Sequence, residues 1–368
     1  MSQSHDATAA RLARVRERLA ERDMAGALVL HLPNVRYLTG FSGSSGALWV
    51  RPERAIFATD GRYTQQAEEE LDGEEFELLV ASDGLLEALT ERIGGEASGE
   101  RVGFESRYVS HAAWERMSET AGSVRWTAIS GMVEALRAVK DAGELARIER
   151  AADLSARALL DVLSLARPGV REAELAAELD FGMRRLGASG PAFETIVASG
   201  PRTALPHAST SERSLREGDL VLFDFGARWQ GYAADLTRVF VLGEPQPRQV
   251  EVYGKVLAAQ RSAMEVLRDG AAAVDVDRAA RAIFAEVDLE EHFPHSTGHG
   301  LGLEVHEGPR LSRRSEERVE AGMVVTVEPA LYFAGWGGIR IEDDVVVTES
   351  GPRPLVDLQR GRLISLPV

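Results

Sequence analysis

Residues 219–241, DLVLFDFGARWQGYAADLTRVFV, place two acidic residues, Asp224 and Asp235, inside two otherwise apolar runs. The runs alternate or are β-branched as strands are, and a polar segment containing glycine separates them. A turn centred between Trp229 and Gln230 puts Asp224 directly opposite Asp235, with their Cβ atoms roughly 5 Å apart. The stretch therefore predicts a β-hairpin that carries a facing pair of carboxylates.

A second stretch, residues 324–347, VVTVEPALYFAGWGGIRIEDDVVV, repeats the arrangement. A turn centred on Gly335 puts Glu328 opposite Glu342. Buried carboxylates held together repel one another, and leaving them unpaired costs several kcal/mol or forces one to stay protonated. The two pairs therefore predict a divalent cation site, of two ions. The alternative is that all four are surface residues on exposed strand faces. This is common for a single acidic residue, but it is unlikely for two mirrored pairs in otherwise apolar strands.

The composition limits the class of protein. A length of 368 residues favours two domains. The net charge of −16 argues against a nucleic-acid partner. The chain has no cysteine, so disulfides, thiolate metal sites and cysteine nucleophiles are excluded. No window approaches 18 consecutive apolar residues and the start of the chain lacks the apolar core of a secretory signal, so we expect a cytoplasmic enzyme with no membrane contact.

The order of predicted elements divides the chain. Alternating strands and helices predict an α/β domain over residues 1–132, in which residues 34–46, NVRYLTGFSGSSG, form a turn rich in glycine and serine. Residues 133–145 join it to a long helix. Residues 146–368 read as helix, helix, hairpin, twice over. We therefore predict an α+β domain of two pseudo-symmetric halves that close on one site.

Three of the eight histidines lie in HSTGHGLGLEVH, namely His295, His299 and His306. A lone histidine is more often structural than a ligand. The glycines around His299, however, allow backbone and a bound ion to approach closely. One neutral imidazole with four carboxylates makes a donor set dominated by oxygen, which favours Mn²⁺, with Co²⁺ or Zn²⁺ possible.

Five motifs in this order, FDFG, DLTR, TGHGLGLEVHE, VEP and GIRIED, resemble one enzyme family. It is the dinuclear metallopeptidase family of the pita-bread fold, which includes methionine aminopeptidase, aminopeptidase P, prolidase and creatinase. The likeness covers the whole chain, because NVRYLTGFSGSSG and ATDGRYTQQA resemble the creatinase-type N-terminal domain of the proline-directed branch. They are most similar to aminopeptidase P sequences.

The resemblance implies a role for each candidate residue. Asp224, Asp235 and Glu342 would hold one ion, and Asp235, His299, Glu328 and Glu342 would hold the other. Glu328 would also transfer a proton, and His306 would donate to the developing oxyanion. Thr237 would orient Asp235. The residues expected to line the bound substrate are His207, His295, Arg340 and Tyr332, of which Arg340 is a candidate to capture a carboxylate.

The implied activity is hydrolysis of the N-terminal Xaa-Pro bond of peptides by a hydroxide that bridges two metal ions. The first alternative is a prolidase, an Xaa-Pro dipeptidase that acts on dipeptides. Further alternatives are a catalytically silent binding module and a creatinase-type hydrolase on the same fold. The resemblance also implies a homodimer.

Overall fold

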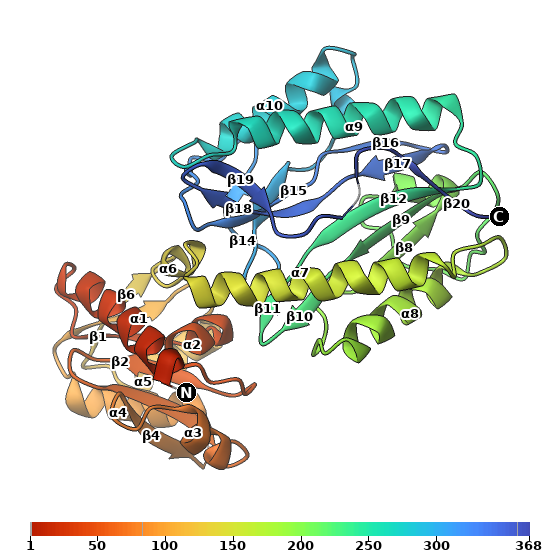
Figure 1. Ribbon diagram of the computed structural model, residues 1–368. Coiled ribbons are helices and arrows are strands. Elements are labelled where there is room, and N and C mark those ends of the chain that lie inside the picture. Colours follow the sequence, from red (N-terminus) through yellow and green to blue (C-terminus); the bar gives the residue numbers. More distant parts are fainter. Residues whose placement is uncertain (1, 83, 359) are drawn as a thin grey trace. The chain divides into compact units, whose positions relative to one another are not determined.

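The computed structural model describes residues 2–82, 84–358 and 360–368. It divides between Arg137 and Ala138 into two compact units, which we describe separately (Figure 1). No described helix is long and apolar enough to cross a membrane.

The N-terminal unit contains one sheet with helices around it. Its strands are β1 (Gly26–Val29), β2 (Ala47–Val50), β3 (Ala55–Asp60), β4 (Phe76–Ala81), β5 (Arg101–Glu105) and β6 (Arg125–Ile129). Its helices are α1 (Ser2–Ala20), α2 (Leu32–Thr39), α3 (Thr64–Glu70), α4 (Leu85–Glu96), α5 (His111–Thr120) and α6 (Glu134–Ala138). The strand order is β4-β3-β2-β1-β5-β6, with antiparallel pairing of β2 to β1 and to β3 and parallel pairing elsewhere. This mixed sheet confirms the predicted α/β character.

Helix α2 corrects one prediction in this unit, because it occupies much of the segment expected to be a turn. Proline stands in its first turn, where the fixed φ of the ring suits a helix start. Gly40 ends it with a left-handed φ of 79°, which glycine adopts without strain. The glycine- and serine-rich turn is therefore confined to residues 40–46.

The C-terminal unit contains four long helices and several small sheets. Its helices are α7 (Ala142–Leu163), α8 (Glu172–Arg185), α9 (Pro247–Val266) and α10 (Ala273–Ala285), with short 3-10 helices η1 (Gly200–Ala204) and η2 (Glu290–His292). The strands of its first half are β7 (Gly190–Pro191), β8 (Ile196–Ser199), β9 (Leu220–Phe225), β10 (Ala227–Trp229), β11 (Tyr232–Ala233) and β12 (Leu236–Leu242). The remaining strands are β13 (Gly298–Gly300), β14 (Glu307–Leu311), β15 (Val324–Val327), β16 (Ala330–Phe333), β17 (Gly337–Arg340), β18 (Asp343–Thr348), β19 (Gly351–Pro354) and β20 (Ile364–Leu366).

The two predicted halves are visible in this unit. Helices α7 and α8 pack on the sheet β20-β12-β9-β8, while α9 and α10 accompany the sheet β14-β13-β15-β18-β19 and the hairpin β16-β17. The strands lie between α7 and α9 in Figure 1. Two buried apolar clusters lie in this unit: one contains residues of α7 and α8, and the other contains residues of α9 and α10 together with residues of β9 and β12. The structure therefore confirms the repeated order of helix, helix and hairpin.

The first hairpin forms, but its register differs from the prediction by two residues. Asp224 pairs with Thr237 rather than with Asp235. The turn consists of Gln230 and Gly231, both with positive φ, at 47° and 90°. Two such residues make the tight turn whose twist matches a hairpin, so the turn centre lies one residue later than expected. Because the shift is an even number, Asp224 and Asp235 remain on one face and become diagonal neighbours.

The second hairpin has the predicted register, since β16 and β17 pair Leu331 with Ile339 about Gly335. An isolated antiparallel bridge between Thr237 and Glu342 joins it to the first hairpin, with the Glu342 backbone N–H donating to the Thr237 carbonyl at 3.2 Å. This bridge brings the two carboxylate pairs to a common place.

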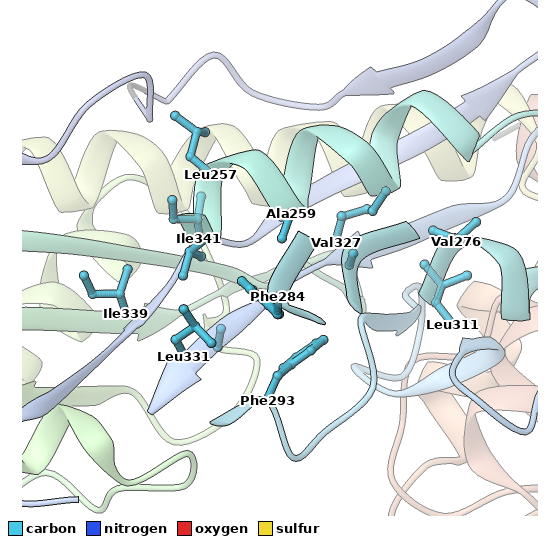
Figure 2. Close-up of a cluster of buried hydrophobic side chains, with 14 of the residues drawn as sticks. Leu257, Ala259, Val276, Phe284, Phe293, Leu311, Val327, Leu331, Ile339 and Ile341 are labelled. Carbon is cyan, nitrogen blue, oxygen red and sulfur yellow. The ribbon is translucent and has the colours of Figure 1, made fainter. Parts of the chain in front are cut away.

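The apolar cluster of the second half determines which way the acidic side chains face. Figure 2 shows Val327 and Ile341 among its members, together with Phe284 and Phe293, whose ring centroids lie 5.5 Å apart edge to face. Val327 and Ile341 are each 0% exposed and directly precede Glu328 and Glu342 in the chain. Successive side chains of an extended chain point to opposite sides, so burial of the apolar residues turns the carboxylates away from the core.

Candidate metal and substrate site

Four carboxylates and an imidazole from both halves converge. Ligand atoms of Asp224, Asp235 and Glu342 lie within 4.8 Å of one another, as do those of His299, Glu328 and Glu342. Glu342 belongs to both groups. The five residues proposed as metal ligands are therefore brought together in two adjoining sets that share a carboxylate.

His299 presents one ring nitrogen to this cluster. It is 7% exposed, and burial lowers its pKa to about 4, so the ring is neutral. Its Nδ1 lies 3.1 Å from the Gly300 carbonyl, which can only accept, so Nδ1 carries the proton. Nε2 then has a lone pair that faces oxygens of Asp235 at 3.7 Å and Glu328 at 3.5 Å. Acceptors that face one another require a cation or a shared proton between them.

The carboxylates of this cluster also lack enough positive charge around them. Burial raises the pKa of Asp235 well above its usual value, and the charges of Glu342 and Asp224 raise it further. Burial and the charge of Glu328 likewise raise the pKa of Glu342, and burial raises that of Glu328 to about 7. These residues fit divalent ions, which would neutralise the mutual repulsion and occupy the lone pairs.

The glycines beside His299 were predicted to let backbone and a bound ion approach closely, and the structure confirms the approach of backbone. A Cβ on Gly298 would overlap the backbone carbonyl of Thr326, and one on Gly300 would overlap that of Gly308. Close approach of neighbouring backbone therefore demands glycine at both positions, and no ion is needed to explain them.

Arg340 lies beside the acidic cluster with all its nitrogens in use. Its Nε donates to the Thr237 hydroxyl at 3.0 Å, and Nη1 donates to the Tyr332 hydroxyl at 2.8 Å and the Pro206 carbonyl at 3.2 Å. Its Nη2 is ion-paired with Asp224. This engagement argues against the carboxylate-capturing role expected for Arg340 and makes it the counter-charge of Asp224.

Thr237 acts on a different carboxylate from the one predicted. Its hydroxyl donates to Oε2 of Glu342 at 2.6 Å, whereas we expected it to orient Asp235. The residue that holds Asp235 is Asp344, whose carboxylate accepts from the Asp235 backbone N–H at 3.0 Å. The two-residue change of register moved Thr237 opposite Asp224 and against the second hairpin, which explains the difference.

His295 and Tyr332 form a relay with Arg340. The His295 Nδ1 lies 2.9 Å from the Ser296 carbonyl, so it carries the proton, and Nε2 accepts from the Tyr332 hydroxyl at 3.1 Å. That hydroxyl in turn accepts from Arg340. Burial lowers the pKa of His295 to about 4. The relay presents His295 to the pocket as a neutral ring in a fixed orientation.

A cavity of about 320 Å³ opens over the cluster. His207, His295, His306 and Arg340 line it together with the five ligand candidates. Tyr332 lies behind His295, against which its ring is tilted. His306 packs edge to face on His299, with centroids 4.4 Å apart. The candidate substrate residues are therefore collected at one cavity, with Tyr332 as a support.

The same cavity contains residues that sequence reasoning did not select, namely Phe193, Ile196, Ser296, Val305 and Arg310. Ile196 lies directly opposite Asp224 on β8, a position that the pairing of strands could have indicated. The guanidinium of Arg310 has no hydrogen-bond or ion-pair partner among the described residues. It is therefore the cation at this cavity that is free to meet an anionic substrate group.

A buried ion pair on α10 supports the segment that carries His295. The Asp277 carboxylate accepts from the Thr297 backbone N–H at 3.0 Å and hydroxyl at 2.8 Å, and it pairs with Arg281 at 2.7 Å. Arg281 donates to the carbonyls of Phe293, at 3.0 Å, and His295. Asp277 is 0% exposed. The pair therefore holds this segment at several points along its backbone.

We expect Asp277→Asn to lower the melting temperature by about 3–10 °C, because a hydrogen bond to a charged partner contributes about 1.5–3 kcal/mol. Asparagine keeps an acceptor for Thr297 but removes the charge that Arg281 requires. The half-buried Asp275→Asn, which breaks an ion pair on the same helix, is the control and is expected to shift the melting temperature by about 2 °C or less. Equal shifts in thermal melts of the two variants would contradict the supporting role.

Comparisons with known proteins agree with this geometry. Residues 146–349 match Metallopeptidase family M24, and residues 11–139 match the Creatinase/Prolidase N-terminal domain. The Xaa-Pro dipeptidase of Pyrococcus horikoshii is 35% identical over 334 residues, which cover 90% of this chain and 93% of that protein.

Two solved structures share the whole fold. The structure of an Xaa-Pro dipeptidase from Bacillus anthracis has a TM-score of 0.93 at 36% identity, over 98% of this chain and 100% of that one. The structure of an X-Pro aminopeptidase from Thermotoga maritima has a TM-score of 0.87 at 37% identity, over 96% of this chain and 99% of that one. The chain therefore belongs to metallopeptidase family M24, with a pita-bread catalytic domain and a creatinase/prolidase N-terminal domain.

Proposed function

We propose that the protein hydrolyses the bond between an N-terminal residue and a following proline. The observation that carries the proposal is the pair of adjoining ligand sets, which comprise Asp224, Asp235, His299, Glu328 and Glu342 beneath one small cavity. The relatives named above are an aminopeptidase and dipeptidases whose names specify Xaa-Pro or X-Pro bonds, which supports the choice of bond. The complete ligand set argues against a silent binding module and against a metal-independent creatinase-type hydrolase.

The proposed orientation of the substrate follows from the charges in the cavity. The free amine lies at the Asp224 end, where a carboxylate faces the cavity beside the apolar Ile196 and Phe193. The proline ring lies between His207 and His295. A requirement for the amine at this end restricts cleavage to the first peptide bond.

The metal ions would be held by the two ligand sets. When bound, they supply a Lewis acid for the scissile carbonyl and lower the pKa of water, which makes it a nucleophile near neutral pH. The oxygen-rich donor set favours Mn²⁺, with Co²⁺ or Zn²⁺ as alternatives.

The chain's own residues then move the protons. Glu328 reaches the cavity with a partly exposed carboxylate, and it takes a proton from the attacking water. It returns this proton to the proline nitrogen, which must be protonated before it leaves. His306 donates an N–H to the carbonyl oxygen as negative charge develops there.

Dipeptides fit this site without further assumptions. A dipeptide with proline in second place carries its carboxylate next to the ring. Arg310, whose guanidinium has no partner among the described residues, lines the cavity, as does His295. A charge-assisted hydrogen bond to Arg310 would hold the carboxylate. We therefore propose Xaa-Pro dipeptides as substrates. The longer peptides of an Xaa-Pro aminopeptidase are the second candidate, which the likeness to the X-Pro aminopeptidase from Thermotoga maritima supports.

Hydrolysis of Ala-Pro and of Ala-Ala by protein first stripped of metal and then loaded with Mn²⁺ tests the proposal. We expect Ala-Pro hydrolysis that depends on added metal, with Ala-Ala slower by about two orders of magnitude or more because its backbone lacks the ring that the two histidines accommodate. Comparable rates on the two dipeptides would refute the proline requirement. Hydrolysis of Ala-Pro that chelators leave unchanged would refute the metal centre.

The predicted homodimer and cytoplasmic location stay predictions. Light scattering of the purified protein measures the mass of the assembly directly, and a monomeric mass at micromolar concentration would contradict the dimer.

A further inference from the structure

Glu172 is a buried carboxylate that lies outside the catalytic cavity. It stands in the first turn of α8 and is 0% exposed. Its Oε1 accepts from the Ser199 backbone N–H at 2.8 Å and from the Ser199 hydroxyl at 2.7 Å. Its Oε2 accepts from the Ser211 backbone N–H at 3.1 Å and hydroxyl at 2.6 Å, and from Arg202 Nε at 3.1 Å. Hydrogen bonds to both oxygens, one of them from a cation, therefore compensate for the burial of this charge.

The partners of Glu172 belong to the His207 loop, residues 199–211. Ser199 is the last residue of β8 and precedes His207, whereas Ser211 follows it. The helix adds a backbone contact at the second of these ends, because the Ala173 N–H donates to the Ser211 carbonyl at 3.1 Å. One carboxylate therefore attaches both ends of the loop to the first turn of α8.

Arg202 extends this attachment across the loop. It lies in η1, where its Nε donates to Glu172 and its Nη2 donates to the Ser209 carbonyl. Arg202 precedes His207 in the chain and Ser209 follows it, so the guanidinium connects the two sides of the loop. The orientation of this guanidinium depends in turn on Glu172, which is its ion-pair partner.

His207 depends on the loop backbone for its position. Its imidazole lines the cavity but makes no hydrogen bond or ion pair with any residue that the structure describes. The nearest direct tie is at the residue before it, where the Pro206 carbonyl accepts from Arg340 at 3.2 Å. A displacement of the loop by about 1 Å would therefore move the ring by a similar distance, which is enough to weaken a contact with substrate.

We propose that Glu172 is a positioning residue that fixes His207 against the proline ring of the substrate and so contributes to the preference for proline. It does not line the cavity, and it acts through the His207 loop. This inference rests on the proposed function, because the contact between His207 and the proline ring is taken from it.

The variant Glu172→Gln tests the proposal. Glutamine is close to glutamate in size but has one acceptor oxygen, so it can accept from the Ser199 side or from the Ser211 side but not from both. For protein loaded with Mn²⁺, we expect the ratio of kcat/KM on Ala-Pro to kcat/KM on Ala-Ala to fall by about tenfold. This ratio does not depend on the fraction of folded protein, so a purely structural role would leave it unchanged. An unchanged ratio would overturn the proposal.

Glu174→Gln is the matched control. Glu174 lies in the same turn of α8, is exposed and pairs with Arg171 at 3.0 Å, so its replacement should leave the ratio at the wild-type value. If Glu172→Gln does not fold, Ser211→Ala takes its place, because it removes one hydroxyl that donates to Glu172 and leaves the carboxylate intact. We expect Ser211→Ala to lower the ratio by about two- to threefold, as the loss of one hydrogen bond allows. A ratio that Ser211→Ala leaves at the wild-type value would contradict the role of Glu172.

The variant His207→Ala shows whether the effect passes through His207. In a protein that already carries His207→Ala, we expect Glu172→Gln to change the ratio by less than about twofold, because two residues that act as one unit are not additive. Equal effects of Glu172→Gln with and without His207 would overturn the proposed route. A wild-type preference for Ala-Pro that survives in Glu172→Gln would overturn the positioning role alone. A wild-type protein with no such preference would instead overturn the proposed function, and this inference with it.

Discussion

Replacing Glu342 by glutamine is expected to reduce metal-dependent hydrolysis by more than about 100-fold. Loss of a residue that only supports a metal ligand already costs up to roughly 100-fold, and Glu342 is proposed as a ligand itself. Glu342 belongs to both ligand sets, so the change removes one anionic ligand from each proposed ion. The same variant should make the metal-free protein more stable. Burial and the charges of Glu328 and Asp224 raise the pKa of Glu342, so a neutral amide removes both the cost of burying a charge and the repulsion, and its oxygen can still accept from Thr237. Each kcal/mol regained should raise the melting temperature by about 2–4 °C.

Three measurements on this variant check the prediction. Ala-Pro hydrolysis and the amount of Mn²⁺ bound per chain should both fall, while the melting temperature in chelator should rise. Glu349→Gln is the matched control, because Glu349 is exposed directly after β18, the strand that Glu342 directly precedes, and its replacement should change none of these values. Full metal content and activity in Glu342→Gln would remove Glu342 from the ligand set.

The alternation of apolar and acidic residues was sufficient to predict the two hairpins and the faces of their carboxylates. It was insufficient for the register of the first hairpin, because moving a turn centre by one residue shifts the pairing by two without changing any face. The sequence did not indicate that Gln230, which is not a glycine, adopts a positive φ. The error in register therefore misplaced Thr237 but did not change the set of candidate ligands.

The sequence alone did not predict contacts between segments that are far apart in the chain. The Asp224–Arg340 ion pair joins residues 116 positions apart, and the bond from Arg340 to the Pro206 carbonyl spans 134 positions. No local pattern marks such partners, because they depend on how the two hairpins and the His207 loop pack together. The support of the His295 segment by Asp277 was missed for the same reason, although both residues of the Asp277–Arg281 pair lie one turn apart on a helix.

Arg310 shows a second limit. A cation that could meet a substrate carboxylate was expected, and Arg340 was the candidate because it lies within a family motif. Choosing between two arginines requires knowing which one is already paired, and this depends on tertiary contacts. Among the residues that the structure describes, the Arg310 guanidinium has no partner, whereas Arg340 is engaged at every nitrogen.

Replacing Arg340 by methionine is expected to destabilise the metal-free protein by about 3–5 kcal/mol, because removal of one partner leaves the largely buried Asp224 carboxylate without a counter-charge. The melting temperature in chelator should fall by about 6 °C or more. Loading with Mn²⁺ should restore more stability to this variant than to the wild type, since Asp224 would be a ligand of a proposed ion, which would replace the lost positive charge.

The metal dependence of the loss separates this role from simple packing. A side chain that only filled space would cost the same stability with and without Mn²⁺, and such equal losses in thermal melts would refute the counter-charge role.

Arg340→Lys keeps the charge but cannot reach Thr237, Tyr332 and Asp224 at once, because one ammonium replaces three nitrogens in a planar fork. In chelator, Arg340→Lys should lose less stability than Arg340→Met, because it keeps the positive charge. The stability that it gains on loading with Mn²⁺ should approach the gain of the wild type. Intermediate stability with wild-type metal dependence would assign the effect to charge, and a loss equal to that of methionine would assign it to the fork of hydrogen bonds.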